Sequence, residues 1–125
     1  MDKQLQSLID EIESASGKID ADMHMTNVRI LDVYTETFYP GALVIRNGKI
    51  VALNPSWTVQ AQQVFDGRGM CAVPGFMDAH VHIETTLLTP EALASVIVPW
   101  GTTTMFVDAM EIANVLGIKG LKALL

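Results

Sequence analysis

Residues 73–84 read VPGFMDAHVHIE, an apolar segment that ends in two histidines with acids on both sides. The pattern predicts a buried strand over residues 76–80 with polar residues at its carboxyl end. Side chains two positions apart on a strand point to the same side, so His80 and His82 should project together. Imidazole is a common ligand of divalent transition metals, and we interpret the two histidines as one side of a metal site. Asp78 and Glu84 are the carboxylates that could orient the two rings.

A His-x-His pair also occurs by chance in many proteins that bind no metal. Catalytic metals usually have three or more protein ligands, so His80 and His82 cannot complete a site by themselves. The context favours metal binding, because the pair lies at the expected end of a strand and carries acids on both sides.

The residues that follow alternate between helix and strand patterns. Thr89 should cap a helix over residues 90–98, and a β-branched, apolar strand should follow at 102–107. Further helices are expected at 111–116, stopped by a glycine, and at 119–125. The order of strand, helix, strand and helix is typical of a parallel sheet or barrel, whose functional groups gather at the carboxyl ends of the strands.

Asp108 follows the second of these strands, on the same expected face as His82. It could orient a metal ligand, contact a substrate or cap the next helix. Glu111 and Asn114 lie one helical turn apart and could reach the site, although ordinary helix polarity explains them as well. We expect Trp100 to pack at a loop where the preceding helix ends.

The N-terminal segment, residues 1–25, is interpreted as an amphipathic helix and a linker. Its apolar residues recur at helical spacing, which predicts a stripe that packs on the body of the protein rather than on a partner. The stripe consists of Leu5, Leu8, Ile9 and Ile12. His24 should be solvated in the linker.

Residues 26–73 are interpreted as short strands of a small, partial β-sandwich or sheet. A strand at 34–39 should end in a turn at Pro40 and Gly41. Asn47-Gly48 lies between two apolar runs, which is a strong hairpin signal because both turn positions require positive φ. Two more strands are expected at 62–66 and 70–73. Cys71 should be a buried, inert thiol.

Composition excludes several classes of protein. The chain has 125 residues, of which 50% are hydrophobic, and its formal net charge is −6. Whole-chain disorder is excluded by this apolar content, and the charge disfavours nucleic acid and anionic membranes as partners. Apolar runs are too short for a membrane helix, the first residues do not resemble a signal peptide, and a single cysteine cannot form an internal disulfide. We therefore expect a cytoplasmic protein.

The segment at 73–82 resembles the first barrel strand of the metal-dependent amidohydrolase superfamily. Residues 82–90, HIETTLLTP, are similar to the signature of the adenine deaminase family, and residues 99–104 and 111–117 match the next two blocks of that family. The resemblance extends over essentially the whole chain.

The resemblance implies an α/β protein with an N-terminal helix (1–25), a partial β-sandwich (26–73) and the first two βα units of an incomplete (β/α)8 barrel (74–125). It implies hydrolysis of adenine, a small purine, to hypoxanthine and ammonia at a dinuclear Mn2+ or Fe2+ centre. His80 and His82 take the role of metal ligands. Glu84, Asp108 and Glu111 match further family positions near the site. Together with Asp78, they would orient the metal ligands or contact the substrate. A homo-oligomer is also compatible with the family.

Two departures from the family pattern bear on activity. Met110 stands where the family has histidine, and a thioether can neither donate a hydrogen bond nor transfer a proton. Trp100 replaces a residue that is usually polar. In addition, a (β/α)8 barrel needs about 250 residues, whereas only 52 follow position 73.

We therefore expect an N-terminal fragment that is inactive by itself, with the catalytic acid/base outside the chain. The alternatives are another amidohydrolase, such as a hydantoinase or dihydroorotase relative, or a degenerate fragment without activity.

Overall fold

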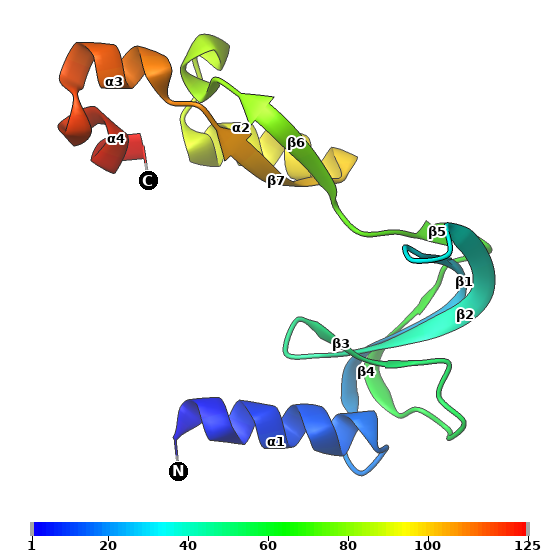
Figure 1. Cartoon of the computed structure of the whole chain (residues 1–125). Coiled ribbons are helices and arrows are strands. Elements are labelled where there is room, and N and C mark those ends of the chain that lie inside the picture. The colour runs from blue at the N-terminus through cyan, green and yellow to red at the C-terminus, as the bar shows by residue number, and fades with distance from the viewer. Residues whose placement is uncertain (1, 125) are drawn as a thin grey trace. The chain divides into compact units, whose positions relative to one another are not determined.

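The chain divides between Val73 and Pro74 into two units in a computed structural model that describes residues 2–124 (Figure 1). Residues 2–73 form one helix and a curved sheet, and residues 74–124 alternate strands with helices. The mixed α/β class expected from the sequence is confirmed, whereas a closed barrel is not formed by the described residues.

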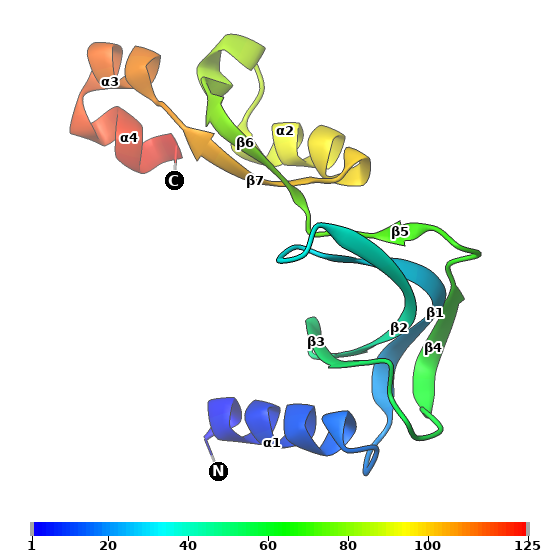
Figure 2. The ribbon, with the colours of Figure 1, turned by 45° about the vertical axis from the view of Figure 1, so that its right-hand side comes forward.

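The first unit is built around one long strand, β1 (Ala21–Asp32). β2 (Thr37–Arg46) pairs antiparallel with β1, and β3 (Lys49–Leu53) pairs antiparallel with β2. On its other side, β1 pairs in parallel with β4 (Ala61–Asp66) and further along with β5 (Cys71–Ala72). The five strands form one sheet that bends along β1 and β2 (Figure 2).

The predicted hairpin at Asn47-Gly48 is confirmed. It joins β2 to β3, and the two residues have φ of 52° and 71°, as the tight turn requires. The core of this unit consists of Val28, Ile30 and Leu43, and the side chain of Val44 is also fully buried.

Helix α1 (Lys3–Ala15) begins at Asp2, whose carboxylate accepts the N–H of Gln4. The helix itself was predicted, but the side on which it packs was predicted wrongly. Leu5, Leu8 and Ile12 are 50%, 52% and 60% exposed, whereas Glu11 and Ser14 are buried. The apolar stripe therefore does not pack on the sheet of its own unit.

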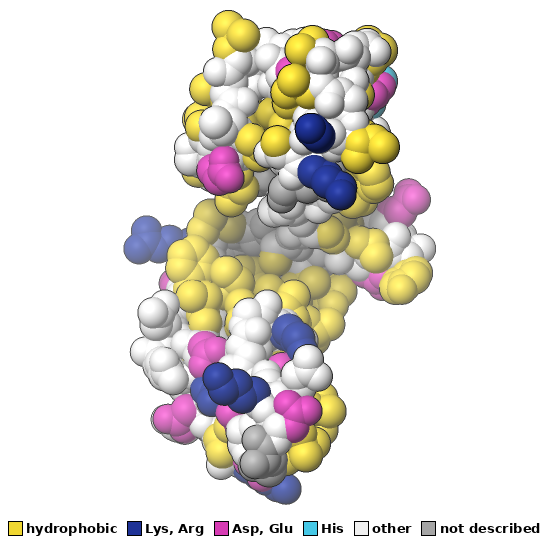
Figure 3. All heavy atoms as spheres, turned by 90° about the vertical axis from the view of Figure 1, so that its left-hand side faces the viewer, with side chains coloured by type: hydrophobic (Ala, Val, Ile, Leu, Met, Phe, Trp, Pro, Cys, Tyr) yellow, Lys and Arg dark blue, Asp and Glu magenta, His cyan; other side chains and the backbone are white. Residues whose placement is uncertain are grey.

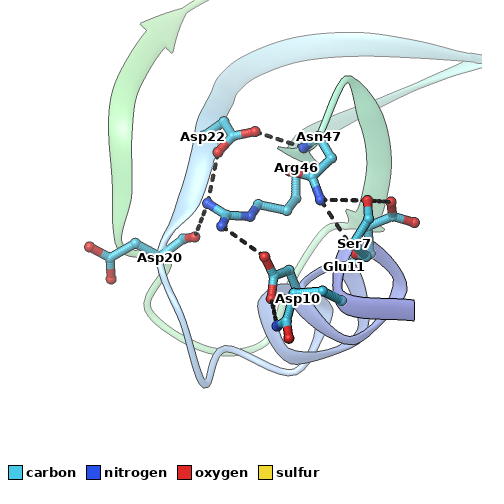
Figure 4. A network of polar contacts seen from close by, with 8 residues as sticks. Ser7, Asp10, Glu11, Asp20, Asp22, Arg46 and Asn47 are labelled. Carbon is cyan, nitrogen blue, oxygen red and sulfur yellow. Dashed lines mark hydrogen bonds and ion pairs between the residues drawn. The ribbon is translucent and has the colours of Figure 1, made fainter. Parts of the chain in front are cut away.

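Polar contacts explain this orientation of α1 (Figure 4). The carboxylate of Glu11 accepts two hydrogen bonds from Lys49 Nζ, at 3.0 and 3.1 Å. Arg46 forms ion pairs with Asp10 at 3.6 Å and with Asp22 at 2.8 Å, and so joins α1 to β1. The polar side of α1 is therefore held against the sheet.

Further predictions for this unit were also wrong. His24 lies within β1, opposite Val44, and is partly buried rather than solvated in a linker. The turn between β1 and β2 precedes Pro40, because the Asp32 carboxylate accepts the N–H groups of Tyr34 and Thr35 and closes the chain there. Cys71 is exposed, because β5 is only two residues long and lies at the margin of the sheet. Of the two alternatives expected for residues 26–73, a partial sandwich or a sheet, the described residues show one five-stranded sheet.

The second unit has the predicted order of elements. β6 (Phe76–Val81) and β7 (Thr102–Val107) form a parallel pair. The connection between them contains the short helices η1 (Ile83–Thr86) and η2 (Val98–Trp100) on either side of α2 (Pro90–Ile97). Thr89 caps α2 as expected, with its hydroxyl accepting the N–H of Ala92. Helices α3 (Met110–Leu116) and α4 (Ile118–Leu124) follow β7.

The strands of this unit are exposed, although the sequence predicted buried ones. Phe76, Met77 and Phe106 are each at least 60% exposed, and Trp100, which was expected to pack at a loop, is 83% exposed. A parallel sheet is normally buried by neighbouring strands and by helices on both faces, and a two-stranded pair leaves these side chains uncovered. Apolar side chains are visible at the surface of both units (Figure 3).

Leu125, the last residue of the helix predicted at 119–125, lies outside the described residues. Among the helices of residues 2–124, none is long and apolar enough to cross a membrane.

Candidate metal centre

The carboxyl ends of β6 and β7 bring the candidate residues together. The two strands run in parallel with Val81 opposite Val107. Beyond this pair, the N–H of Asp108 donates to the carbonyl of Val81 at 2.9 Å. Because the strands end side by side, the residues that follow them, His82 and Asp108, leave the sheet at the same edge.

His80, His82 and Asp108 form a cluster of three potential metal ligands. One ligand atom from each lies within 4.8 Å of the other two. Nε2 of His80 lies 3.3 Å from Oδ2 of Asp108, and Nε2 of His82 lies 3.9 Å from the same oxygen. The two imidazole rings are 5.0 Å apart between centroids. The two histidines thus lie on one side, as the i, i+2 spacing predicted.

Glu111 supports this cluster from α3. Its Oε2 lies 3.0 Å from Nδ1 of His82. The hydrogen bond that His82 donates to Glu111 is the main cause that raises the pKa of His82 above its ordinary value. The charges of Glu111, Asp108 and Glu84 act in the same direction, against an opposing effect of burial. When Nδ1 carries the proton, Nε2 keeps a lone pair that can bind a metal.

Two of the predicted carboxylates bind backbone groups instead of imidazoles. Oδ1 of Asp78 accepts the N–H of His80 at 3.1 Å. Oε1 of Glu84 accepts the N–H of Ile112 at 3.2 Å, and its Oε2 is buried without a hydrogen-bond partner in the described part of the chain. Sequence reasoning missed the bond to Ile112, because a backbone donor 28 residues away leaves no pattern in the sequence.

Of the three roles that the sequence left open for Asp108, capping of the next helix is not the one that the structure shows. The N-cap residue of α3 is Ala109, and no side chain at that position bonds the start of the helix. Asp108 instead faces the two histidines. Within residues 2–124, no hydrogen bond joins Asn114 to the cluster, and Met110 is half exposed at the start of α3.

The donor set fits a divalent transition metal. Two imidazole nitrogens and one carboxylate oxygen are the ligands that zinc, manganese and iron share. Ligand atoms bound to one metal at about 2.1 Å lie roughly 3–4.3 Å from one another, and both contacts of Asp108 Oδ2 fall in this range. Glu111 meets the free nitrogen of His82, as carboxylates commonly do behind metal-bound histidines.

No family model matches the chain, but solved structures do. The N-acyl-D-glutamate deacylase of Bordetella bronchiseptica, in complex with zinc and a phosphonate inhibitor, matches with a TM-score of 0.59 and 26% identity over 71% of this chain and 19% of its own. A prolidase in complex with N-methylphosphonate-L-proline matches in fold, with a TM-score of 0.53 and 22% identity over 77% of this chain and 29% of its own. The first match identifies the class as the amidohydrolase superfamily, whereas the second shows a likeness of fold alone.

Curated sequences narrow the class further. The adenine deaminase of Desulforamulus reducens is 66% identical over 119 residues, which are 95% of this chain and 20% of the relative. The adenine deaminase of Lysinibacillus sphaericus is 42% identical over 125 residues, the whole of this chain and 22% of the relative. The chain is thus homologous to the N-terminal part of adenine deaminases, as residues 82–90 indicated, and spans about a fifth of the length of these relatives.

Proposed function

We propose that the chain is the N-terminal portion of an adenine deaminase, and that the whole protein hydrolyses adenine to hypoxanthine and ammonia. The main support is the 66% identity to a curated adenine deaminase over 95% of the chain. The clustering of His80, His82 and Asp108 supports the same proposal, because it lies in the part of the chain that carries the family signature. By itself the chain should be inactive, since the acid/base residue of the family is expected outside it.

His80, His82 and Asp108 would hold a divalent metal, Mn2+ or Fe2+, as part of a dinuclear centre of the whole protein. When bound, such a metal lowers the pKa of water enough to supply a nucleophile near neutral pH. The carboxylate of Glu111 accepts a hydrogen bond from Nδ1 of His82 and so keeps the proton on that nitrogen. Nε2 is then free to bind the metal. Asp108 brings a negative charge that offsets the charge of the cation.

The substrate proposed for the whole protein is a small, neutral purine, and nucleic acid and membranes are not expected partners because the chain is acidic. We propose a cytoplasmic location and leave open a homo-oligomer. Residues 74–125 would supply the first two βα units of a (β/α)8 barrel. Residues 26–73 would supply part of a β-sandwich, preceded by the helical segment at 1–25.

A chimera tests this function. The N-terminal fifth of the Desulforamulus reducens adenine deaminase would be replaced by this chain, because the two are 66% identical there. We expect the chimera to release ammonia from adenine and to form hypoxanthine, and we expect the 125-residue chain to do neither. The His80→Ala chimera should lose the activity, whereas a His24→Gln chimera should keep it, because His24 lies in the sheet of the other unit.

Three results would contradict parts of the proposal. A folded, metal-loaded chimera that leaves adenine unchanged would show that this chain cannot serve in an adenine deaminase. A chimera that instead opens hydantoin or dihydroorotate would favour the alternative of another amidohydrolase. Full activity of the His80→Ala chimera would remove the metal-ligand role from that residue.

A further inference from the structure

We infer that Glu84 is a positioning residue of the metal centre: it ties η1 to the start of α3 and thereby holds Glu111 on His82. The tie itself is the hydrogen bond from the N–H of Ile112 to Oε1 of Glu84, at 3.2 Å. The consequence for metal binding rests on the function proposed above. Glu84 itself is not placed among the ligands, because the cluster that can share a metal contains His80, His82 and Asp108.

Helix α3 depends on Glu84 because its own cap is missing. The first four N–H groups of a helix have no partner inside the helix, and a side chain just before the helix usually accepts one of them. In α3 the N-cap residue is Ala109, which has no acceptor. The carboxylate of Glu84 supplies that acceptor from 28 residues away, and its negative charge also suits the start of a helix.

Glu84 is itself held in place by its neighbours. Ile83 is 3% exposed and anchors η1. The hydroxyl of Thr85 donates to the carbonyl of His82 at 2.8 Å, and the hydroxyl of Thr86 donates to the carbonyl of Ile83 at 2.6 Å. The first bond links η1 to the backbone of His82 and the second lies within η1, so Glu84 and His82 belong to one segment that is held by hydrogen bonds.

Two contacts therefore join the same pair of segments. His82 precedes Glu84 by two residues, and Glu111 directly precedes Ile112. One contact is the 3.0 Å hydrogen bond between Nδ1 of His82 and Glu111, and the other is the bond between Glu84 and Ile112. Loss of the second contact would free the start of α3, and Glu111 would hold His82 less firmly.

Two substitutions of Glu84 can distinguish a positioning role from direct contact with the metal or the substrate, because one of its carboxylate oxygens has no hydrogen-bond partner in the described residues. Oε2 is buried and has no hydrogen-bond partner within residues 2–124. A glutamine can place its carbonyl oxygen on Ile112 and its amide in the position of Oε2, so Glu84→Gln keeps the tie while it removes the charge. Glu84→Ala removes both. A residue that touches the metal or the substrate through its charge would be disabled by either substitution.

The test uses the 125-residue chain, its Glu84→Ala and Glu84→Gln variants, and Glu91→Ala in α2 as the matched control. Amide hydrogen exchange is measured at Ile112 without metal, and the affinity for Mn2+ is measured by calorimetry. In Glu84→Ala we expect exchange at Ile112 to accelerate roughly tenfold or more and Mn2+ affinity to fall roughly 10-fold, the lower end of the effect of groups that support metal ligands. In Glu84→Gln and Glu91→Ala, the exchange rate at Ile112 and the Mn2+ affinity should both remain within about threefold of the parent chain, which is less than the loss expected when the support of a metal ligand is removed.

The two readouts separate this inference from the proposed function. If the parent chain binds no Mn2+, the proposed centre fails, and the exchange rates still decide whether Glu84 ties η1 to α3. Unchanged exchange in Glu84→Ala overturns the tie. A Glu84→Gln variant that exchanges as the parent does but binds Mn2+ as weakly as Glu84→Ala overturns the positioning role, because its charge would then be what matters. Circular dichroism checks that each variant is folded.

Discussion

Nδ1 of His82 lies 3.0 Å from the carboxylate of Glu111, while Nε2 of the same ring lies 3.9 Å from Asp108. One imidazole therefore lies between a carboxylate that fixes its proton and a carboxylate that could share a metal with it. The hydrogen bond is possible because α3 begins two residues after Asp108 and carries Glu111 in its first turn. The position of the proton on His82 therefore depends on where α3 places the carboxylate of Glu111.

We predict that Glu111→Gln lowers the pKa of His82 in the metal-free chain. The hydrogen bond that His82 donates to Glu111 is the main cause that holds this pKa above its ordinary value, and glutamine removes the negative charge that favours the imidazolium. An NMR titration of the histidine ring protons measures the change, with Glu91→Gln as the control. An unaltered His82 titration in Glu111→Gln would show that the contact does not govern the proton.

The same contact predicts how stability depends on pH. The pKa of His82 is raised in the folded chain, so the imidazolium–Glu111 pair stabilises the fold fully below the unfolded pKa of about 6.5 and ceases to do so as pH rises through the higher folded pKa. The difference in unfolding free energy between the parent chain and Glu111→Gln should therefore be largest at mildly acidic pH, where Glu111 is ionised and His82 is protonated, and should shrink at alkaline pH. Urea denaturation across this pH range measures it, and a difference that grows with pH would contradict the assignment.

Mn2+ binding should weaken as pH falls through the raised pKa of His82. A metal must displace the proton from Nε2, so binding and protonation of this ring exclude each other. Calorimetry of the 125-residue chain in buffers of different ionisation enthalpy should show proton release at acidic pH. His82→Ala should abolish both the binding and the release, whereas His24→Gln should change neither. Equal Mn2+ affinity on both sides of the His82 pKa would contradict the assignment of this ring as a ligand.

Local patterns in the sequence predicted much of the candidate centre. The i, i+2 spacing of His80 and His82 and the strand that ends at Asp108 depend on backbone periodicity, which acts over a few residues. Two parallel strands then bring these groups together. The bond between Glu84 and Ile112 could not be foreseen, because it joins a side chain to a backbone group that any residue type except proline would provide.

Helix α1 shows a different limit of sequence reasoning. Its hydrophobic stripe was expected to face the sheet, because burial of apolar side chains usually stabilises a fold more than exposed ion pairs do. Instead, Lys49 and Arg46 hold the polar side of α1 to the sheet, and Leu8 remains exposed. The sequence shows that a helix has two faces, but which face meets the sheet depends on partners that are distant along the chain.

We predict that α1 separates from the sheet in acid. The pKa of Glu11 is lowered, mainly by its hydrogen bond with Lys49 and against an opposing effect of burial. A lowered folded pKa means that the pair stabilises the fold above the unfolded pKa of about 4.5 and that this contribution is lost as pH falls through the folded value. The difference in unfolding free energy between the parent chain and Glu11→Gln, measured in urea, should therefore vanish at low pH. Lys49→Met should remove the same pH dependence, and its persistence in that variant would contradict the role of Lys49.

Gly17→Ala should destabilise the first unit more than the same change at Gly69. Both glycines have positive φ, 74° and 83°, so both substitutions have the backbone cost of about 1 kcal/mol. A Cβ on Gly69 would meet open space, whereas a Cβ on Gly17 would lie 2.6 Å from Cδ1 of Trp57. Forced overpacking of this kind typically adds about 1–3 kcal/mol.

Urea denaturation followed by circular dichroism measures the loss of stability in both glycine variants. In a Trp57→Ala background the difference between the two glycine variants should disappear, because the indole that causes the clash is gone. Equal losses at the two positions in the parent chain would show that Trp57 does not pack on the end of α1.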